Sequence, residues 1–198
     1  MGIVGHPPRI LAGFDGSAAS YDALHLAGAF AQIKNGRLDV AAVLLHHPLE
    51  RRVLADPDDA AAYFNRVFAK ASEGLPGVAM SCWELQASDF SATRALIDLA
   101  ENEGVELVVV GSTHRGPMGR VIPGALGERL VQSAPCPVAI APRGFADRAR
   151  FRHGVVGVGY QGPQDSEPAV EWSQPARPGA RREGSRHRRG GHAALGMA

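Results

Sequence analysis

The segment from residue 107 to residue 142 combines residue types that bind anions. It runs from an apolar stretch, LVVVG, into a loop of serine, threonine, histidine and arginine, and then into a short predicted helix opened by Gly124. Backbone N–H groups in such a loop and at a helix N-terminus point toward a shared space and favour negative charge there. The pattern therefore predicts an anion site, most simply one for phosphate.

Alternating strand and helix patterns must position this loop. The run LDVAAVLL at 38–45 is continuously apolar, which is typical of a parallel strand buried on both faces. Predicted strands are 9–14, 38–45, 78–85, 106–110 and 137–141; predicted helices are 18–33, 57–73, one capped by Ser88-Asp89 and ended by Glu103-Gly104, and one opened by Gly124. This order predicts an α/β fold with an open five-stranded parallel sheet and helices on both faces.

Ligands of such sheets bind beyond the carboxyl ends of the strands, where the strand order reverses. Three segments meet this requirement: residues 13–17 after the first strand, His46-His47 after the second, and residues 111–115 after the fourth, together with Gly124. We expect these segments to outline one crevice.

Composition and charge narrow the function classes. The net charge is +1, but residues 173–198 are rich in arginine, so the rest of the chain is mildly acidic and is not expected to bind nucleic acid. Cys82 and Cys136 fit no metal-ligand spacing, which favours buried, reduced thiols. The N-terminus has no signal-peptide core and no run is as long as a membrane span, so we expect a cytoplasmic protein without membrane contact.

Catalytic residue patterns are missing from the sequence. There is no pair of carboxylates, no nucleophile beside a base and no metal-ligand cluster in the predicted domain. We therefore expect that the protein is not an enzyme.

Three motifs carry a resemblance to a known family: ILAGFDGS at 10–17, AVLLHHP at 42–48, and GSTHRGPMGRVIPGALGERLVQSAPCPVAIAP at 111–142. Over residues 9–143 the chain resembles the universal stress protein family. The resemblance implies a Rossmann-like domain at 1–147, of the adenine nucleotide alpha hydrolase-like type. It also implies a stress-response module that binds ATP with little or no catalysis.

Nucleotide-binding members of that family carry the loop motif G-x2-G-x9-G-[S/T]. Gly111 and Gly124 match it, whereas His114 stands at the second glycine and Ala125 at the Ser/Thr position. Histidine adopts positive φ less readily than glycine, yet its imidazole, beside Arg115, can donate to a phosphate.

Ala125 removes a hydroxyl donor. Losing one hydrogen bond to a charged group costs about 1.5 to 3 kcal/mol, or roughly one to two decades in affinity. The backbone N–H groups of Ala125 and Leu126 remain available at the helix start, so we expect weakened binding of ATP.

Other residues correspond to family positions around the nucleotide. Asp15 matches the acidic residue that faces the ribose or adenine; alternatively, Asp15 and Ser17 only cap the first helix. His47 stands where the family places a small apolar residue against adenine; it either stacks on a purine or is a loop histidine without a ligand. Ser112 donates to phosphate or bonds its own turn. The resulting candidate set is Asp15, Gly16, Ser17, His47, Gly111, Ser112, His114, Arg115, Gly124, Ala125 and Leu126.

A second function class stays open. The last strand, 137–141, is flanked by Pro137 and Pro142, as is typical of an edge strand. In the resembling family this edge mediates homodimerisation by antiparallel pairing. The alternative to nucleotide binding is therefore a dimerisation or interaction module whose phosphate loop is degenerate.

Residues 148–172 resemble the opening of a second domain of the same kind. At an offset of 146, Gly159, Gly162 and Ser166 match Gly13, Gly16 and Ser20. After Trp172 the likeness stops, and the Arg-rich residues 173–198 have too little apolar surface to fold alone, so we expect them to be disordered. Our hypothesis is that a frameshift truncated a tandem protein, which the nucleotide sequence tests. The competing view is that the Arg-rich segment is an arm that binds nucleic acid or acidic surfaces.

Overall fold

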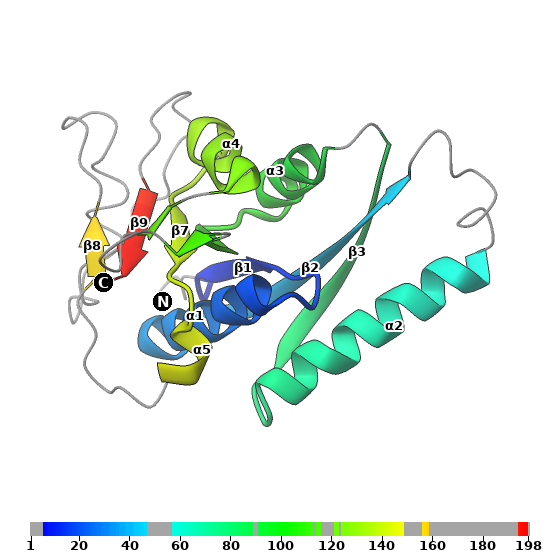
Figure 1. The fold of residues 1–198 in the computed structure, drawn as a ribbon, viewed down its shortest axis with the longest axis horizontal. Coiled ribbons are helices and arrows are strands. Elements are labelled where there is room, and N and C mark those ends of the chain that lie inside the picture. The colour runs from blue at the N-terminus through cyan, green and yellow to red at the C-terminus, as the bar shows by residue number, and fades with distance from the viewer. Residues whose placement is uncertain are drawn as a thin grey trace, which may run out of the picture.

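The structure is a computed structural model that describes residues 6–46, 57–88, 91–112, 114–115, 121–122, 124–148, 156–158 and 194–197. Helices and strands alternate along the chain (Figure 1). The elements are β1 (Arg9–Gly13), α1 (Ala18–Lys34), β2 (Arg37–His46), α2 (Pro57–Gly74), β3 (Met80–Ser88), α3 (Ala92–Glu103), β4 (Leu107–Gly111), β5 (His114–Arg115), β6 (Val121–Ile122), α4 (Ala125–Ser133), β7 (Val138–Ala141), α5 (Phe145–Arg148), β8 (Val156–Val158) and β9 (Ala194–Met197).

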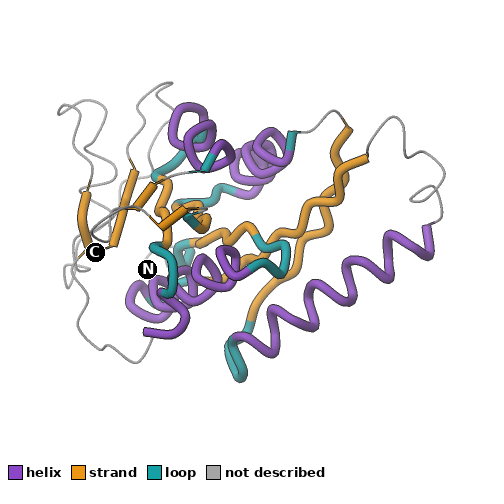
Figure 2. Tube along the Cα trace, viewed as in Figure 1, coloured by secondary structure: helices purple, strands orange, loops and turns teal. Residues whose placement is uncertain are grey.

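Five parallel strands in the order β3-β2-β1-β4-β7 form the main part of the sheet (Figure 2). The predicted five-stranded parallel sheet is thereby confirmed. β1 ends its pairing with β2 at Gly13 and Ala41, whereas β2 and β3 stay paired as far as His46 and Ser88. The β2–β3 pair therefore extends beyond the end of β1.

Side chains alternate between two apolar layers, one on each face of the sheet. In β1, Ile10 faces the layer that holds Leu24 of α1 and Phe64 of α2. Its neighbour Leu11 faces the other layer, which holds Leu96 of α3. The sheet is covered on both faces, which explains why its central strands are uniformly apolar.

Local signals set most helix boundaries. α1 ends at Asn35, which adopts a left-handed conformation with φ of 50°, and α3 ends at Gly104 with φ of 64°. One predicted boundary is wrong: α3 is capped by Ser91, whose hydroxyl accepts from the Arg94 N–H at 3.1 Å, and not by Ser88-Asp89. Ser88 pairs with His46 as the last residue of β3, so the strand continues through the predicted cap; Asp89 lies outside the described residues.

A polar network ties the amino ends of the strands to α3. The carboxylate of Asp39, 1% exposed, accepts from Arg9 Nε at 2.8 Å and from Trp83 Nε1 at 3.3 Å. Arg9 also donates to the carboxylate and the carbonyl of Glu103. The buried charge of Asp39 thus has a partner in Arg9, and removal of Arg9 would leave that carboxylate uncompensated.

The two cysteines were predicted to be buried, and neither is fully buried in the structure. Cys82 is exposed and lies on β3, the first strand in the order of the described sheet. Cys136 is half-buried, and burial raises the pKa of its thiol to about 12. Within the described part of the chain, no helix is both long enough and apolar enough to cross a bilayer.

Two short strands extend the sheet beyond β7. β9 pairs in parallel with β7, and β8 pairs antiparallel with β9 (Figure 1). The prediction that 137–141 is an edge strand is therefore wrong, because Ala194–Met197 supplies backbone partners on its outer side. β8 corresponds, at the offset of 146, to residues 10–12 of β1; the division into domains stays a prediction.

Candidate functional site

The strand order reverses between β1 and β4. From β1 the chain crosses through α1 to β2, and from β4 it crosses through α4 to β7 on the other side. Helices that connect parallel strands run antiparallel to them, so α1 and α4 both begin at the carboxyl edge. The structure thus brings residues 15–17, residues 111–112 and the start of α4 to the edge where such sheets bind ligands.

The turn after β1 is held by its own side chains. Asp15 Oδ1 accepts from the Ser17 N–H at 2.9 Å, and Ser17 Oγ accepts from the Ser20 N–H at 3.3 Å. Gly16 between them has φ of 79°, which favours glycine. The helix-capping reading of Asp15 and Ser17 is therefore present in the structure.

The charge of Asp15 is part of this cap. Partial burial would raise the pKa of its carboxyl, but hydrogen bonds from Ser17 and Ser20 outweigh burial and hold the pKa below the usual value. The carboxylate is thus ionised in this turn at neutral pH.

Gly111 at the end of β4 is required by packing. A Cβ on Gly111 would collide with the backbone carbonyl of Ala19 in the first turn of α1. The next residue, Ser112, is fully buried, and its N–H donates to the Ala141 carbonyl at 2.9 Å. Gly111 and Ser112 therefore hold β4 against α1 and β7.

The loop after β4 contains a small ribbon. The backbone of His114 pairs antiparallel with Ile122, and that of Arg115 with Val121. The predicted site residue His47 lies outside the described residues, as do Thr113, residues 116–120 and residue 123.

The N-terminus of α4 differs from those of α1 and α3. Gly124 is its N-cap residue, with extended backbone, and has no side chain with which to cap the helix. Ala125 is exposed at the first helical position. The Glu128 N–H donates to the Gly124 carbonyl oxygen at 2.9 Å as the first bond of the helix, so the N–H groups of Ala125 and Leu126 have no acceptor within the helix. The helix dipole favours an anion at this end, although the acidic Glu128 also lies in the first turn.

α2 adds two residues that sequence reasoning missed. A Cβ on Gly16 would lie 3.5 Å from Lys70 Cδ and 3.7 Å from Lys70 Nζ, so the lysine lies over the β1–α1 turn. The Tyr63 hydroxyl donates to the Val43 carbonyl at 3.5 Å, and burial together with the charge of Asp15 raises the pKa of Tyr63.

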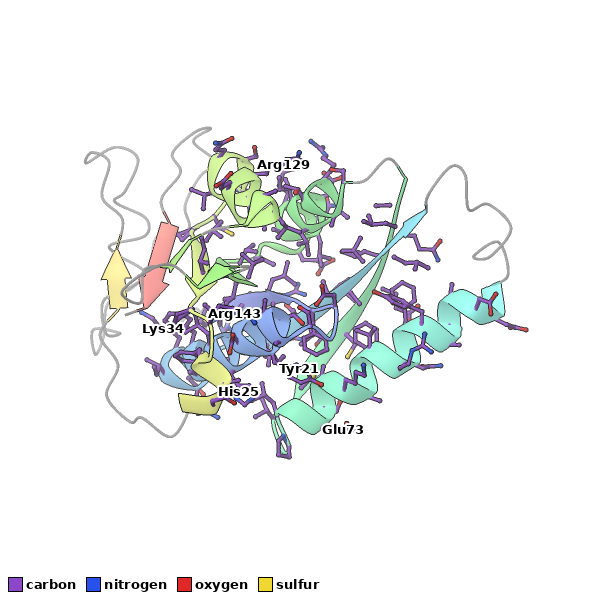
Figure 3. The ribbon with its side chains drawn as sticks, in the orientation of Figure 1. Tyr21, His25, Lys34, Glu73, Arg129 and Arg143 are labelled. Carbon is purple, nitrogen blue, oxygen red and sulfur yellow. The ribbon has the colours of Figure 1, made fainter. Side chains whose placement is uncertain are left out.

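α2 is held beside this turn by Tyr21 of α1, which lies between the two helices (Figure 3). The Tyr21 hydroxyl donates to the Lys70 carbonyl at 3.4 Å, and its ring meets Phe14 edge-on at 5.1 Å. The sequence could have indicated Lys70 only if it showed which face of α2 packs against α1. That depends on tertiary packing.

Metal ligation has no support in the described part of the chain, where no three His, Cys, Asp or Glu residues gather to hold an ion. Nor does Lys70 form an ion pair with any described carboxylate. The carboxyl edge therefore combines a capped turn, a lysine and an uncapped helix start.

The chain is similar in sequence to known proteins. A universal stress protein of Mycobacterium tuberculosis is 31% identical over 144 residues, which are 69% of this chain and 49% of that protein. A universal stress protein of Mycobacterium bovis gives the same values. The chain thus spans about half the length of these curated relatives.

Solved structures show the same fold. UspA from Lactobacillus plantarum has a TM-score of 0.56 and 23% identity, over 69% of this chain and 99% of that one. A universal stress protein in complex with cAMP has a TM-score of 0.50 and 19% identity, over 70% of this chain and 99% of that one. The model of the universal stress protein family matches residues 7–142, and the chain belongs to this family.

Proposed function

We propose that this chain binds an adenine nucleotide, ATP in the first place, at the carboxyl edge between β1 and β4. The observation that carries the proposal is the N-terminus of α4, where the N-cap residue Gly124 supplies no side-chain acceptor to the N–H groups of the first turn. A phosphate group is the ligand that such a helix start favours. The complex of a structural relative with cAMP supports an adenine nucleotide as the class of ligand.

The residues at this carboxyl edge fit phosphate better than they fit a ribose. The Asp15 and Ser17 side chains already accept hydrogen bonds within the β1–α1 turn, whereas Lys70 lies over that turn without a described counter-ion. We assign phosphate to α4 and a weaker, long-range attraction to Lys70. Asp15 contacts the sugar only through those lone pairs of its carboxylate that accept no hydrogen bond within the turn.

Little or no catalysis belongs to the same proposal. Its support is the sequence, in which no nucleophile stands beside a base. The proposal also includes a location in the cytoplasm. Incubation with ATP, followed by chromatography of the nucleotide, tests it: release of ADP or AMP at the rate of an ordinary enzyme would contradict a non-catalytic role.

Calorimetric titration of the full chain with ATP tests binding. We expect a dissociation constant raised by about one to two decades relative to a site with a serine at position 125. Ala125→Ser should therefore tighten binding, and His114→Gly combined with Ala125→Ser should tighten it further. Adenosine without phosphate is the matched ligand control, and it should bind much more weakly.

The alternative is an interaction module with a degenerate loop. It predicts no heat and no thermal shift at millimolar ATP, both for the natural chain and for the double variant. ATP binding by the double variant alone would show that the fold keeps the site and that His114 and Ala125 have closed it.

A further inference from the structure

The segment that follows β7 packs on α1. The match to the family covers residues 7–142, and residues 143–148, which include α5, lie beyond it. α5 contacts α1 and lies beside it (Figure 1). Phe145 of α5 is half-buried and packs against the apolar layer that holds Leu24 of α1. Residues 143–148 are called the strap below.

The carboxylate of Asp22 in α1 binds the backbone of the strap. Its Oδ2 accepts from the Gly144 N–H and its Oδ1 accepts from the Ala146 N–H, each at 2.9 Å. Asp22 is only 3% exposed. Both oxygens of a buried carboxylate are therefore used by residues that lie 122 and 124 positions further along the chain.

No described side chain supplies a counter-charge to Asp22, which forms no ion pair among the described residues. His25 of α1 lies beside α5 (Figure 3). Burial lowers the pKa of its imidazole, against the charges of Asp22 and Asp147, so His25 is neutral at pH 7. A carboxylate in the interior is costly unless it accepts hydrogen bonds. The two strap N–H groups supply those bonds.

The strap depends on this contact for its shape. α5 has four residues, and a helix this short is not stable by itself in water. Gly144, just before α5, has φ of 77°, a conformation that other residues adopt at a cost. Its conformation is therefore fixed by Asp22 on one side and by the packing of Phe145 on the other.

We propose that Asp22 is a latch that docks the strap on α1, so that the chain after residue 148 departs from a fixed point. Removal of the latch frees the strap, while the sheet and the helices α1 to α4 stay folded. This role of Asp22 does not depend on nucleotide binding.

Amide hydrogen exchange of the full chain, followed by NMR, tests the latch. In Asp22→Ala the N–H groups of Gly144 and Ala146 should exchange at least about tenfold faster, because both lose a charged acceptor. Asp22→Asn keeps one acceptor oxygen and should give an intermediate rate. Asp98→Ala is the matched control, because it removes an exposed carboxylate of α3 that pairs with Arg94 and should leave exchange in the strap unchanged.

A second variant acts from the side of the strap. Gly144→Ala strains the backbone at a positive φ and leaves α1 unchanged. It should speed exchange at Ala146 and trypsin cleavage after Arg143, and circular dichroism shows whether each variant keeps the helix content of the natural chain. Unchanged exchange in the strap of Asp22→Ala, or of Gly144→Ala if Asp22→Ala does not fold, would overturn the proposal. Equal acceleration in Asp98→Ala would overturn it as well.

Discussion

The helices α1 and α4 begin at the same edge of the sheet but treat their N-termini in opposite ways. α1 is capped by the Ser17 hydroxyl, with Asp15 bonded to the same turn, whereas α4 begins at Gly124 with no side-chain cap. The first four N–H groups of a helix have no acceptor within the helix, and an N-cap side chain accepts a hydrogen bond from one of them. A helix whose N-cap residue is glycine lacks that acceptor. This difference is the reason that we propose α4, and not α1, as the helix that binds the anion.

The strand ends that precede the two helices differ as well. Gly13 in β1 leaves ordinary room for a Cβ, which would lie 3.5 Å from Leu96 Cδ1, whereas at Gly111 in β4 a Cβ would collide with the Ala19 carbonyl. We expect Gly111→Ala to lower the free energy of unfolding by about 3 kcal/mol, because backbone must move. Gly13→Ala should cost less than about 1 kcal/mol.

Urea unfolding followed by circular dichroism measures both glycine variants. If Gly13→Ala is as destabilising as Gly111→Ala, the close approach of α1 to β4 is not the reason that position 111 is a glycine.

Removal of the N-cap hydroxyl of α1 is expected to have the next largest effect on the free energy of unfolding. Ser17→Ala removes the oxygen that accepts from the Ser20 N–H, and we expect a loss of about 1 kcal/mol. Ser91→Ala at α3 is the matched variant and should cost a similar amount. Thermal unfolding compares the two; an unchanged midpoint for Ser17→Ala would show that α1 does not depend on its cap.

The charge of Lys70 on α2 is expected to add to the binding of an anion at this edge. Lys70→Gln should weaken ATP binding by about threefold, the size expected for an exposed charge near an anion. Lys34→Gln is the control, because Lys34 lies in the last turn of α1, away from the carboxyl edge (Figure 3). Calorimetry at low salt measures both, and equal effects would mean that only net charge matters.

Asp15 supplies the smallest effect, through pH. Because its folded pKa lies below the usual value of 3.8, its ionised form stabilises the folded state at pH values above 3.8. That contribution is lost as the pH falls through the folded pKa. In urea titrations from pH 5 to lower pH, Asp15→Asn should lose less stability than the natural chain; an identical acid dependence would contradict the ionised cap.

The sequence predicted the sheet well, because apolar runs such as 38–45 are long and are separated by clear helix signals. It predicted the cap of α3 wrongly, because Ser88-Asp89 and Ser91 both fit a cap and only the pairing of Ser88 with His46 decides between them. The prediction that β7 is an edge strand was wrong for a similar reason. Parallel pairing with residues 194–197 leaves no periodic signal in so short a segment.

The candidate site was named from a sequence motif and stays a prediction. Gly111 and Gly124 were found by motif, yet the sequence could not tell that Gly111 serves the packing of Ala19 or that Ser112 is fully buried. Lys70 and Tyr63 were missed because their place depends on how α2 packs against α1. Motifs report residue types at a spacing, whereas these roles depend on contacts between distant elements.

One pair of variants compares the two helix starts directly. Ala18 and Ala125 are each the first residue of their helix and are both exposed, so Ala18→Asp and Ala125→Asp add the same charge at equivalent positions. Titration with ATP should show binding weakened by at least about tenfold in Ala125→Asp and by less than about threefold in Ala18→Asp. Equal weakening, or a larger effect at Ala18, would contradict the assignment of the phosphate to α4.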